Sequence, residues 1–255
     1  MDVIIFGGQS NMQGQTGAVP EVNEPVEGAL EYHVADNSLV PLQIPVGEDL
    51  GGSKYLLGKS HDCGSLIPAF CRAYIKETGK EVVAISACRG DTTIEDWQKG
   101  TYRYSTASSK MLRGINKAKQ KGEVEHIYYV WLQGESDAVI RSTEDEYLER
   151  LIRYKNTLKK EIGIERFCII KVGYFFCNSQ WHTGGTYEEK KACDEAIMSA
   201  QERAVVEDSD FTMLTRVCTE LSMNPEYINP EATGHYNNAG MEIRGTEAGK
   251  ALAKI

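Results

Sequence analysis

The feature that most constrains the fold is an alternation of short, unbroken apolar segments with longer amphipathic ones. Residues 3–6 are entirely apolar and stop at two glycines, as a buried strand does before a tight turn. Strands that are apolar on both faces are typical of a parallel sheet covered by helices on each side. The pattern therefore predicts an α/β protein with an α/β/α layer architecture.

The same reading gives the expected elements along the chain. The predicted strands are residues 3–6, 31–34, 39–44, 81–87, 126–132, 166–176 and 211–216. The predicted helices are residues 66–77, 105–121, 143–160, 187–207 and one from 240 to the C-terminus. Thr143 and Glu146 have the spacing of a capping box, which supports a helix start there. No repeat or linker divides the chain, so residues 1–255 are expected to form a single domain.

The charge balance argues against two classes of partner. The chain has 28 Lys and Arg against 37 Asp and Glu, which gives a net charge of −9. A nucleic-acid-binding protein usually carries a basic face, and an anionic membrane repels a protein of this sign. We therefore expect neither nucleic acid nor membrane as a partner, and the sequence leaves the oligomeric state open.

The N-terminal residues and the hydropathy bear on localisation. No segment approaches the 18 consecutive apolar residues of a membrane span, and MDVIIFGG lacks the basic and long apolar regions of a signal peptide. A cytoplasmic protein is expected, although a leader removed from a longer precursor would also fit.

The cysteines and histidines lack the spacing of metal or disulfide sites. The seven cysteines are an odd number without a CxxC pair, which disfavours a disulfide framework or a structural zinc site. Metal-ligand spacing is also missing among His33, His61, His126 and His182. We expect no metal and no cofactor.

Polar clusters follow several predicted strands, at the sheet edge where α/β proteins bind ligands. In chain order they are GGQSNMQG from Gly7, RGDTTIEDW from Arg89, WLQGESD from Trp131 and GHYNNAG from Gly234. Each has an ordinary structural interpretation as a turn or a helix cap, and Trp97 could be a packing residue. Because four such loops could converge at one edge, a functional site is the better interpretation of the set.

Taken in this order, the four blocks resemble those of SGNH-type carbohydrate esterases. The branch concerned contains sialate O-acetylesterase-like and acetylxylan esterase-like proteins. The blocks run from Gly7 to Gly240 and so bracket nearly the whole chain, and GQSNM and WLQGESD are the most specific. The resemblance implies a flavodoxin-like α/β/α sandwich and the hydrolysis of acetyl esters on sugars.

The resemblance also implies roles for individual residues. Ser10 would be the nucleophile and His235 the general base, because a serine hydroxyl is a weak nucleophile until a base is adjacent. The oxyanion hole would consist of the backbone N–H groups of Ser10 and Gly90 and the side-chain amide of Gln133. Residues expected to line or support the pocket are Gln9, Asn11, Trp97, Glu135, Asp137 and Trp181.

One position departs from the family pattern. The family usually places an acidic residue three positions before the histidine, where this chain has Ala232. Glu231 is the expected substitute, with Glu226 and Asp137 as more distant candidates. A Ser–His dyad whose ring is oriented by a backbone carbonyl is a further alternative.

The expected function is therefore that of a serine esterase acting on acetylxylan, xylo-oligosaccharide or sialic acid esters. Two alternatives stay open at the level of sequence. A non-catalytic carbohydrate-binding protein of the same fold would explain Ala232. A short-chain lipase or thioesterase would need a larger apolar cleft.

Overall fold

One sheet of seven strands runs through the part of the chain that the computed structural model describes, residues 1–47 and 63–255. The strands are β1 (Asp2–Gly8), β2 (Ala29–His33), β3 (Ser38–Pro41), β4 (Val82–Cys88), β5 (Ile127–Leu132), β6 (Arg166–Ile170) and β7 (Phe211–Thr215). Their order is β3-β2-β4-β1-β5-β6-β7, and only the β2–β3 pair is antiparallel. The prediction of a mainly parallel sheet is confirmed. His61 lies outside the described residues.

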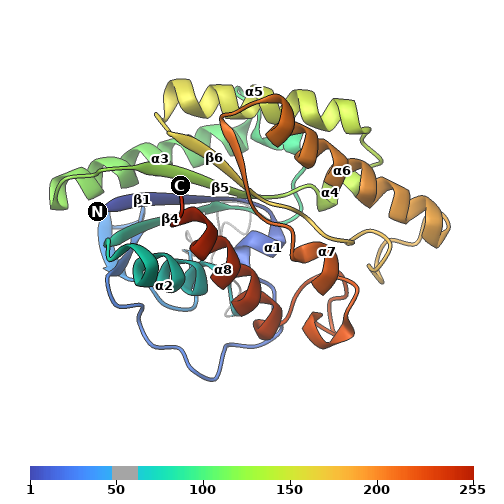
Figure 1. Ribbon diagram of the computed structural model, residues 1–255, viewed down its shortest axis with the longest axis horizontal. Coiled ribbons are helices and arrows are strands. Elements are labelled where there is room, and N and C mark those ends of the chain that lie inside the picture. Colours follow the sequence, from blue (N-terminus) through green and yellow to red (C-terminus); the bar gives the residue numbers. More distant parts are fainter. Residues whose placement is uncertain (48–62) are drawn as a thin grey trace.

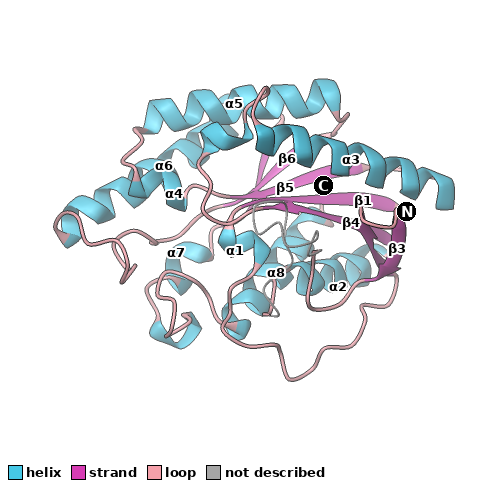
Figure 2. Ribbon diagram, turned by 180° about the vertical axis from the view of Figure 1, so that it is seen from behind, coloured by secondary structure: helices cyan, strands magenta, loops and turns pink. Residues whose placement is uncertain are grey.

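Helices cover both faces of this sheet (Figure 1). One layer holds α3 (Tyr102–Lys121), α5 (Glu144–Glu161) and α6 (Tyr187–Glu207), and the other holds α2 (Ile67–Thr78) and α8 (Asn238–Leu252). The same two layers are seen from behind in Figure 2. The three-layer prediction is confirmed, and so is the capping box of Thr143 and Glu146 at the start of α5.

The core lies between the sheet and these two layers. On the α2 side, the rings of Phe6 and Phe70 meet edge to face with centroids 5.1 Å apart. On the α5 side, Trp131 packs against Tyr154 at 5.2 Å. Aromatic pairs of this kind add stability beyond the area they bury, so they fix both layers to the central strands.

The strand predicted for residues 166–176 is too long, because β6 ends at Ile170. Beyond it, side chains of α6 replace a neighbouring strand as hydrogen-bond acceptors. The N–H of Val172 donates to Gln201 Oε1, and the N–H of Phe176 donates to Asp194 Oδ1. The apolar run therefore continues as a buried loop rather than as a strand.

The order of the strands brings several loops to one place. β1 lies between β4 and β5, with β2, β3 and β4 on one side and β5, β6 and β7 on the other, so the chain crosses from one side of β1 to the other between β4 and β5. Ligands of such sheets bind beyond the carboxyl ends of the strands at this reversal. The short helices α1 (Ser10–Gln13) and α4 (Glu135–Val139) follow β1 and β5 there, as does the loop after β4, and α7 (Cys218–Leu221) follows β7.

Close packing of α8 on α2 positions the C-terminal part of the site. A Cβ atom on Gly245 would lie 2.3 Å from the carbonyl oxygen of Leu66, and one on Gly249 would lie 2.3 Å from that of Phe70. Only glycine permits this approach. The loop before α8, which contains His235, is thereby held against the end of β1.

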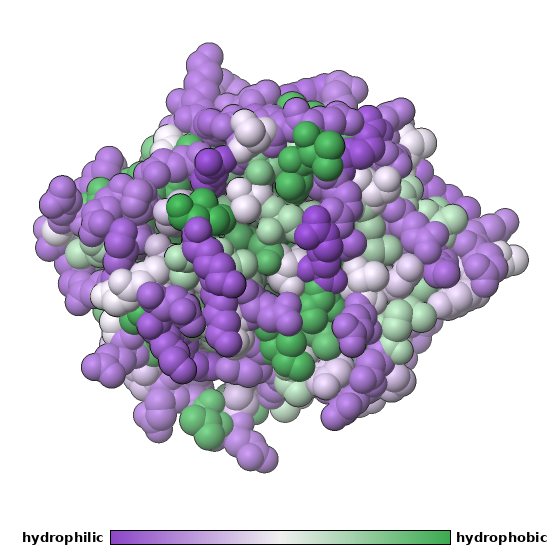
Figure 3. Space-filling model, in the orientation of Figure 1, coloured by the Kyte–Doolittle hydropathy of each residue, from purple (hydrophilic) through white to green (hydrophobic). Residues whose placement is uncertain are grey.

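The surface is mainly hydrophilic on the face drawn in Figure 3, where hydrophobic residues form separate groups. Across the described ranges, no helix is both long enough and apolar enough to span a bilayer.

Candidate active site

Ser10 and His235 meet although 225 positions separate them in the sequence. His235 Nε2 lies 2.9 Å from Ser10 Oγ, and both side chains are almost fully buried. Ser10 follows β1 through Gly8, whose φ of 135° is a conformation that other residues rarely adopt. A Cβ on Gly8 would lie 2.0 Å from the carbonyl oxygen of Leu132. The turn that presents Ser10 therefore requires this glycine.

The other nitrogen of His235 contacts the main chain. Nδ1 lies 3.2 Å from the carbonyl oxygen of Ala232, and the ring meets Phe175 edge to face at 5.3 Å. Burial lowers the pKa of His235 to about 4, although the carbonyl acts in the opposite direction. Because that pKa is far below 7, the ring is neutral at physiological pH and Nε2 can accept a proton.

The prediction that Glu231 orients His235 is wrong in this geometry. Glu231 is exposed, its N–H donates to Asn229 Oδ1, and its carbonyl oxygen accepts from Gln180 Nε2. The loop thus fixes the main chain of residue 231 with its side chain at the surface. The carbonyl of Ala232 occupies the position expected for a carboxylate, as in the dyad alternative.

Asn11 connects the turn that carries Ser10 to the turn that carries His235. Its Nδ2 donates to Glu135 Oε1 at 2.9 Å and to the carbonyl of Gly234 at 3.2 Å. The buried guanidinium of Arg244 donates to the carbonyl of Asn11 at 3.3 Å and lies over the ring of Tyr236. Burial raises the pKa of Glu135, and the hydrogen bond from Asn11 and the charge of Arg244 offset part of that increase. Asn11 and Glu135 therefore support the site and do not line it.

Gln133 is fully buried and its amide is already engaged. Nε2 donates to Asp137 Oδ2 at 2.6 Å, to the carbonyl of Thr92 at 2.8 Å and to Gln9 Oε1 at 3.2 Å. With its two hydrogens committed, this amide does not face the space beside Ser10, so its expected place in the oxyanion hole is wrong. Gln133 instead holds Gln9, which does line the pocket.

Asp137 belongs to the same buried network rather than to the pocket wall. Its carboxylate accepts from Gln133 and from the N–H of Ile94 at 2.9 Å. Burial raises its pKa to about 6. The expectation that Asp137 binds substrate is replaced by a role in fixing the loop after β4.

The two backbone N–H groups that the resemblance implies for the oxyanion hole are those of Ser10 and Gly90, and that role stays a prediction. Ser10 is the first residue of α1, so its N–H has no acceptor within that helix. A Cβ on Gly90 would lie 3.3 Å from the Cβ of Ser10. The N–H of Gly90 donates to Gln13 Oε1 at 2.8 Å, so a substrate oxygen would have to replace that amide.

A pocket of about 320 Å³ opens beside Ser10 and His235. Of the predicted residues, Gln9 and Trp181 also line it, and Trp181 is 56% exposed. Trp97 does not: it is buried against Trp131 and donates to Thr92 Oγ1. The lining residues that the sequence analysis missed are Gln15, Asp91, Thr93, Ser136, Val139, Ile140, Phe175 and His182. Asp91 and Thr93 lie in RGDTTIEDW and Ser136 lies in WLQGESD, so their place in these motifs could have identified them as pocket residues.

A larger cavity of about 580 Å³ lies elsewhere, between residues 20–27 and α2. Its described lining includes the exposed ion pair of Arg72 and Glu242 and no histidine. Without a base beside a hydroxyl group, it offers less chemistry than the smaller pocket at Ser10.

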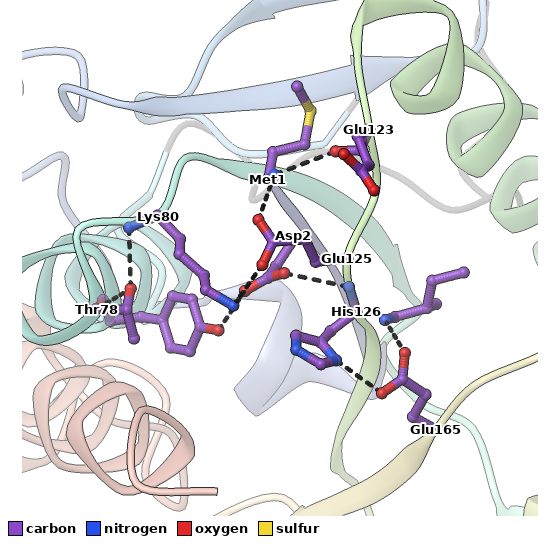
Figure 4. Close-up of polar contacts among 10 residues, drawn as sticks. Met1, Asp2, Thr78, Lys80, Glu123, Glu125, His126 and Glu165 are labelled. Carbon is purple, nitrogen blue, oxygen red and sulfur yellow. Dashed lines mark hydrogen bonds and ion pairs between the residues drawn. The ribbon is translucent and has the colours of Figure 1, made fainter.

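At the opposite edge of the sheet, three side chains have the spacing of metal ligands (Figure 4). Ligand atoms of Asp2, Glu125 and His126 all lie within 4.8 Å of one another. Each already has a partner: Asp2 accepts from Tyr74, Glu125 pairs with Lys80 at 2.9 Å, and His126 Nδ1 contacts Glu165. Because Lys80 and the N-terminal ammonium of Met1 already pair with these carboxylates, we propose no metal site there.

The family of the chain follows from a match over most of its length. The family described as "Carbohydrate esterase, sialic acid-specific acetylesterase" matches residues 1–215. The chain belongs to this family. It is a carbohydrate esterase, as the resemblance of the four sequence blocks implied. His235 lies beyond the matched residues, so its assignment rests on its contact with Ser10.

Solved structures agree on the fold. A protein of Arabidopsis thaliana has a TM-score of 0.68 at 18% identity, covering 99% of this chain and 96% of its own. NanS has 0.64 at 12% identity, covering 98% and 96%. Axe2, an acetylxylan esterase from Geobacillus stearothermophilus, has 0.52 at 12% identity, covering 97% and 91%. A search of curated proteins found no match.

Proposed function

We propose that this carbohydrate esterase removes O-acetyl groups from sugars through an acyl-enzyme formed on Ser10. The observation that carries the proposal is the 2.9 Å contact between Ser10 Oγ and His235 Nε2 at the wall of a pocket. A serine hydroxyl needs such a neighbouring base to become nucleophilic. Candidate substrates are acetylated xylan, xylo-oligosaccharides and sialic acid.

The reaction starts with transfer of the Ser10 hydroxyl proton to His235 Nε2 as Oγ attacks the acetyl carbonyl carbon. The tetrahedral intermediate collapses when His235 returns that proton to the leaving sugar oxygen, which breaks the ester bond. Water then attacks the acetyl-Ser10 ester with His235 as base, and acetate and free Ser10 result. The carbonyl of Ala232 accepts from Nδ1–H throughout and keeps Nε2 facing Ser10.

The negative charge of the tetrahedral intermediate is assigned to the N–H groups of Ser10 and Gly90. The oxyanion of the intermediate displaces Gln13 Oε1, which accepts a hydrogen bond from the N–H of Gly90 in the present structure. A Cβ on Gly90 would lie 3.3 Å from the Cβ of Ser10, so a side chain there would crowd the serine. Loss of one such donor typically lowers kcat by about 10²–10³-fold.

The test is acetate release from acetylated xylo-oligosaccharides and from p-nitrophenyl acetate. Ser10→Ala and His235→Ala should each lower kcat by at least about 10³-fold on both esters, since the two residues act as a unit. Ser109→Ala is the matched control, because Ser109 is an exposed serine on α3. Turnover at the wild-type rate in both site variants would refute the proposal.

Two outcomes would instead select the other functions on this fold. Sugar binding without turnover would indicate a binding protein. A rate that rises from acetyl to octanoyl esters would indicate a lipase or thioesterase. We expect a steep fall with acyl length, because polar Gln9, Thr93 and Ser136 share the small pocket with its apolar residues.

A further inference from the structure

The pocket beside Ser10 has an uneven set of charges. Its ionisable lining residues are Asp91, His182 and His235, and no lysine or arginine appears among the lining residues that the structure describes. Burial keeps the His235 ring neutral by lowering its pKa to about 4. Among the described lining groups, the carboxylate of Asp91 is therefore the one that carries a negative charge, and no lysine or arginine of that lining balances it.

Asp91 is placed where it would meet the sugar part of an ester. It directly follows Gly90, which lies against Ser10, and it is exposed at the pocket. Its φ of 56° falls in the left-handed region, where aspartate is among the residues that occur most often after glycine.

Two cations of the neighbouring segments, Arg141 and Lys190, face other partners. Arg141 lies over the ring of Phe176 at 5.9 Å and donates to the carbonyl of Gly184. Lys190 donates to the carbonyl of His182 and also lies over Phe176. Neither side chain lines the pocket, so neither offers its charge to a bound anion.

We propose that Asp91 makes this pocket select uncharged acetylated sugars over acetylated sugars that carry a carboxylate. A carboxylate side chain accepts hydrogen bonds from the hydroxyl groups of a neutral sugar. The same charge repels an anionic sugar, and sites that recognise carboxylates usually supply an arginine. The exposed face of Trp181 gives the uncharged ring an apolar surface to lie on.

The inference rests on the proposed acetylesterase function and narrows it. The matching family is described as sialic acid-specific, and sialic acid is a sugar acid that is ionised at neutral pH. Because the described pocket pairs no cation with such a group, this chain is expected to prefer neutral xylose- or glucose-type esters.

The experiment compares two esters that differ in one carboxylate. Monoacetylated methyl glucoside and methyl glucuronoside, acetylated at the same hydroxyl, are assayed for acetate release at about 20 mM and about 0.5 M salt. The wild type should prefer the neutral ester by about tenfold in kcat/KM at low salt, and less at high salt, as expected for one repulsive charge pair. Asp91→Asn should reduce that preference to about twofold.

A matched control removes one charge at the opposite edge of the sheet. Glu77→Gln, on the exposed surface of α2, should leave the preference at the wild-type value. A wild-type ratio near one, or a ratio that Asp91→Asn leaves unchanged, would overturn the inference. If Ser10→Ala and His235→Ala release acetate at the wild-type rate, the proposed function itself fails. A Ser10-dependent activity that ignores substrate charge refutes only the role of Asp91.

Discussion

At both ends of the parallel strands, the amino-terminal and the carboxyl-terminal, a histidine lies beside other polar groups, but the two sites are built differently. At the amino-terminal edge, His126 contacts the carboxylate of Glu165 at 2.8 Å in a partly exposed cluster with several charges (Figure 4). At the carboxyl edge, buried His235 contacts a serine and a backbone carbonyl. The ion pairs of the first edge stabilise little because water screens them. The second edge orients its groups through neutral hydrogen bonds and burial, which leave a base unprotonated.

Among variants outside the Ser10–His235 pair, the largest effect is expected where the buried amide network is broken. Gln133→Ala removes the bonds to Gln9, Thr92 and Asp137. Because small displacements of reacting groups are costly, kcat should fall by about 10²-fold. Steady-state kinetics with p-nitrophenyl acetate measure this fall in kcat. An unchanged kcat would show that the network does not position the reacting groups.

Arg244→Met tests whether the buried Arg244 cation links the turn that carries Ser10 to the turn that carries His235. The variant leaves Glu135 without its nearby positive charge and Asn11 without a donor, so it should lose about 3 kcal/mol of unfolding free energy. Arg244 also lowers the pKa of His235, so the acid limb of the pH–rate profile should move to higher pH. Arg244→Lys, which keeps the charge, should shift that limb less. Loss of stability without any shift would assign Arg244 a purely structural role.

Asp137→Asn should change how stability depends on pH. Burial raises the pKa of Asp137 from 3.8 to about 6, so its favourable contribution is present at low pH and is lost as pH rises through 6. The asparagine lacks this dependence and can keep the acceptor for Gln133 and Ile94. Between about pH 4.5 and 7.5, stability should shift in favour of the variant by about 2 kcal/mol. Denaturant unfolding measures the shift, and parallel pH curves for the two proteins would contradict it.

The smallest effect is expected at the amino-terminal edge. Lys80→Met removes the partner of Glu125 at a site where both side chains are partly exposed. Such pairs contribute about 1 kcal/mol or less, and kcat/KM should stay within about twofold of wild type. Thermal unfolding and an esterase assay check both values. A large loss of activity would show that the two edges are coupled.

The sequence predicts the sheet well because its strands are apolar on both faces. The ends of β1, β4 and β5 are recognisable for that reason, and the polar motifs after them predict where Ser10 and Gly90 lie. The end of β6 is different, since Gln201 and Asp194 of α6 take over its backbone hydrogen bonds. An exchange between distant segments leaves no periodic signal in the sequence.

The same limit explains the site residues that were misplaced. Trp97, Gln133 and Asp137 carry polar groups that suit a pocket, and they bond to one another's loops in the interior instead. For Glu231, the decisive factor is the path of the loop, which brings the carbonyl of Ala232 to the ring. Motif position predicts which loops meet, whereas the direction of each side chain depends on the packing of all of them.

We propose that His235 is a buried, neutral base whose ring contacts the Ala232 carbonyl and, among the described residues, no carboxylate. The pH dependence of kcat/KM for p-nitrophenyl acetate tests it most directly, because it reports the pKa of the base in the free enzyme. We expect an acid limb with a midpoint near 4, the same in wild type and Glu231→Gln, with activity recovered on return to neutral pH. A midpoint near 7 in the wild type, or a loss of about 10⁴-fold in Glu231→Gln, would contradict it.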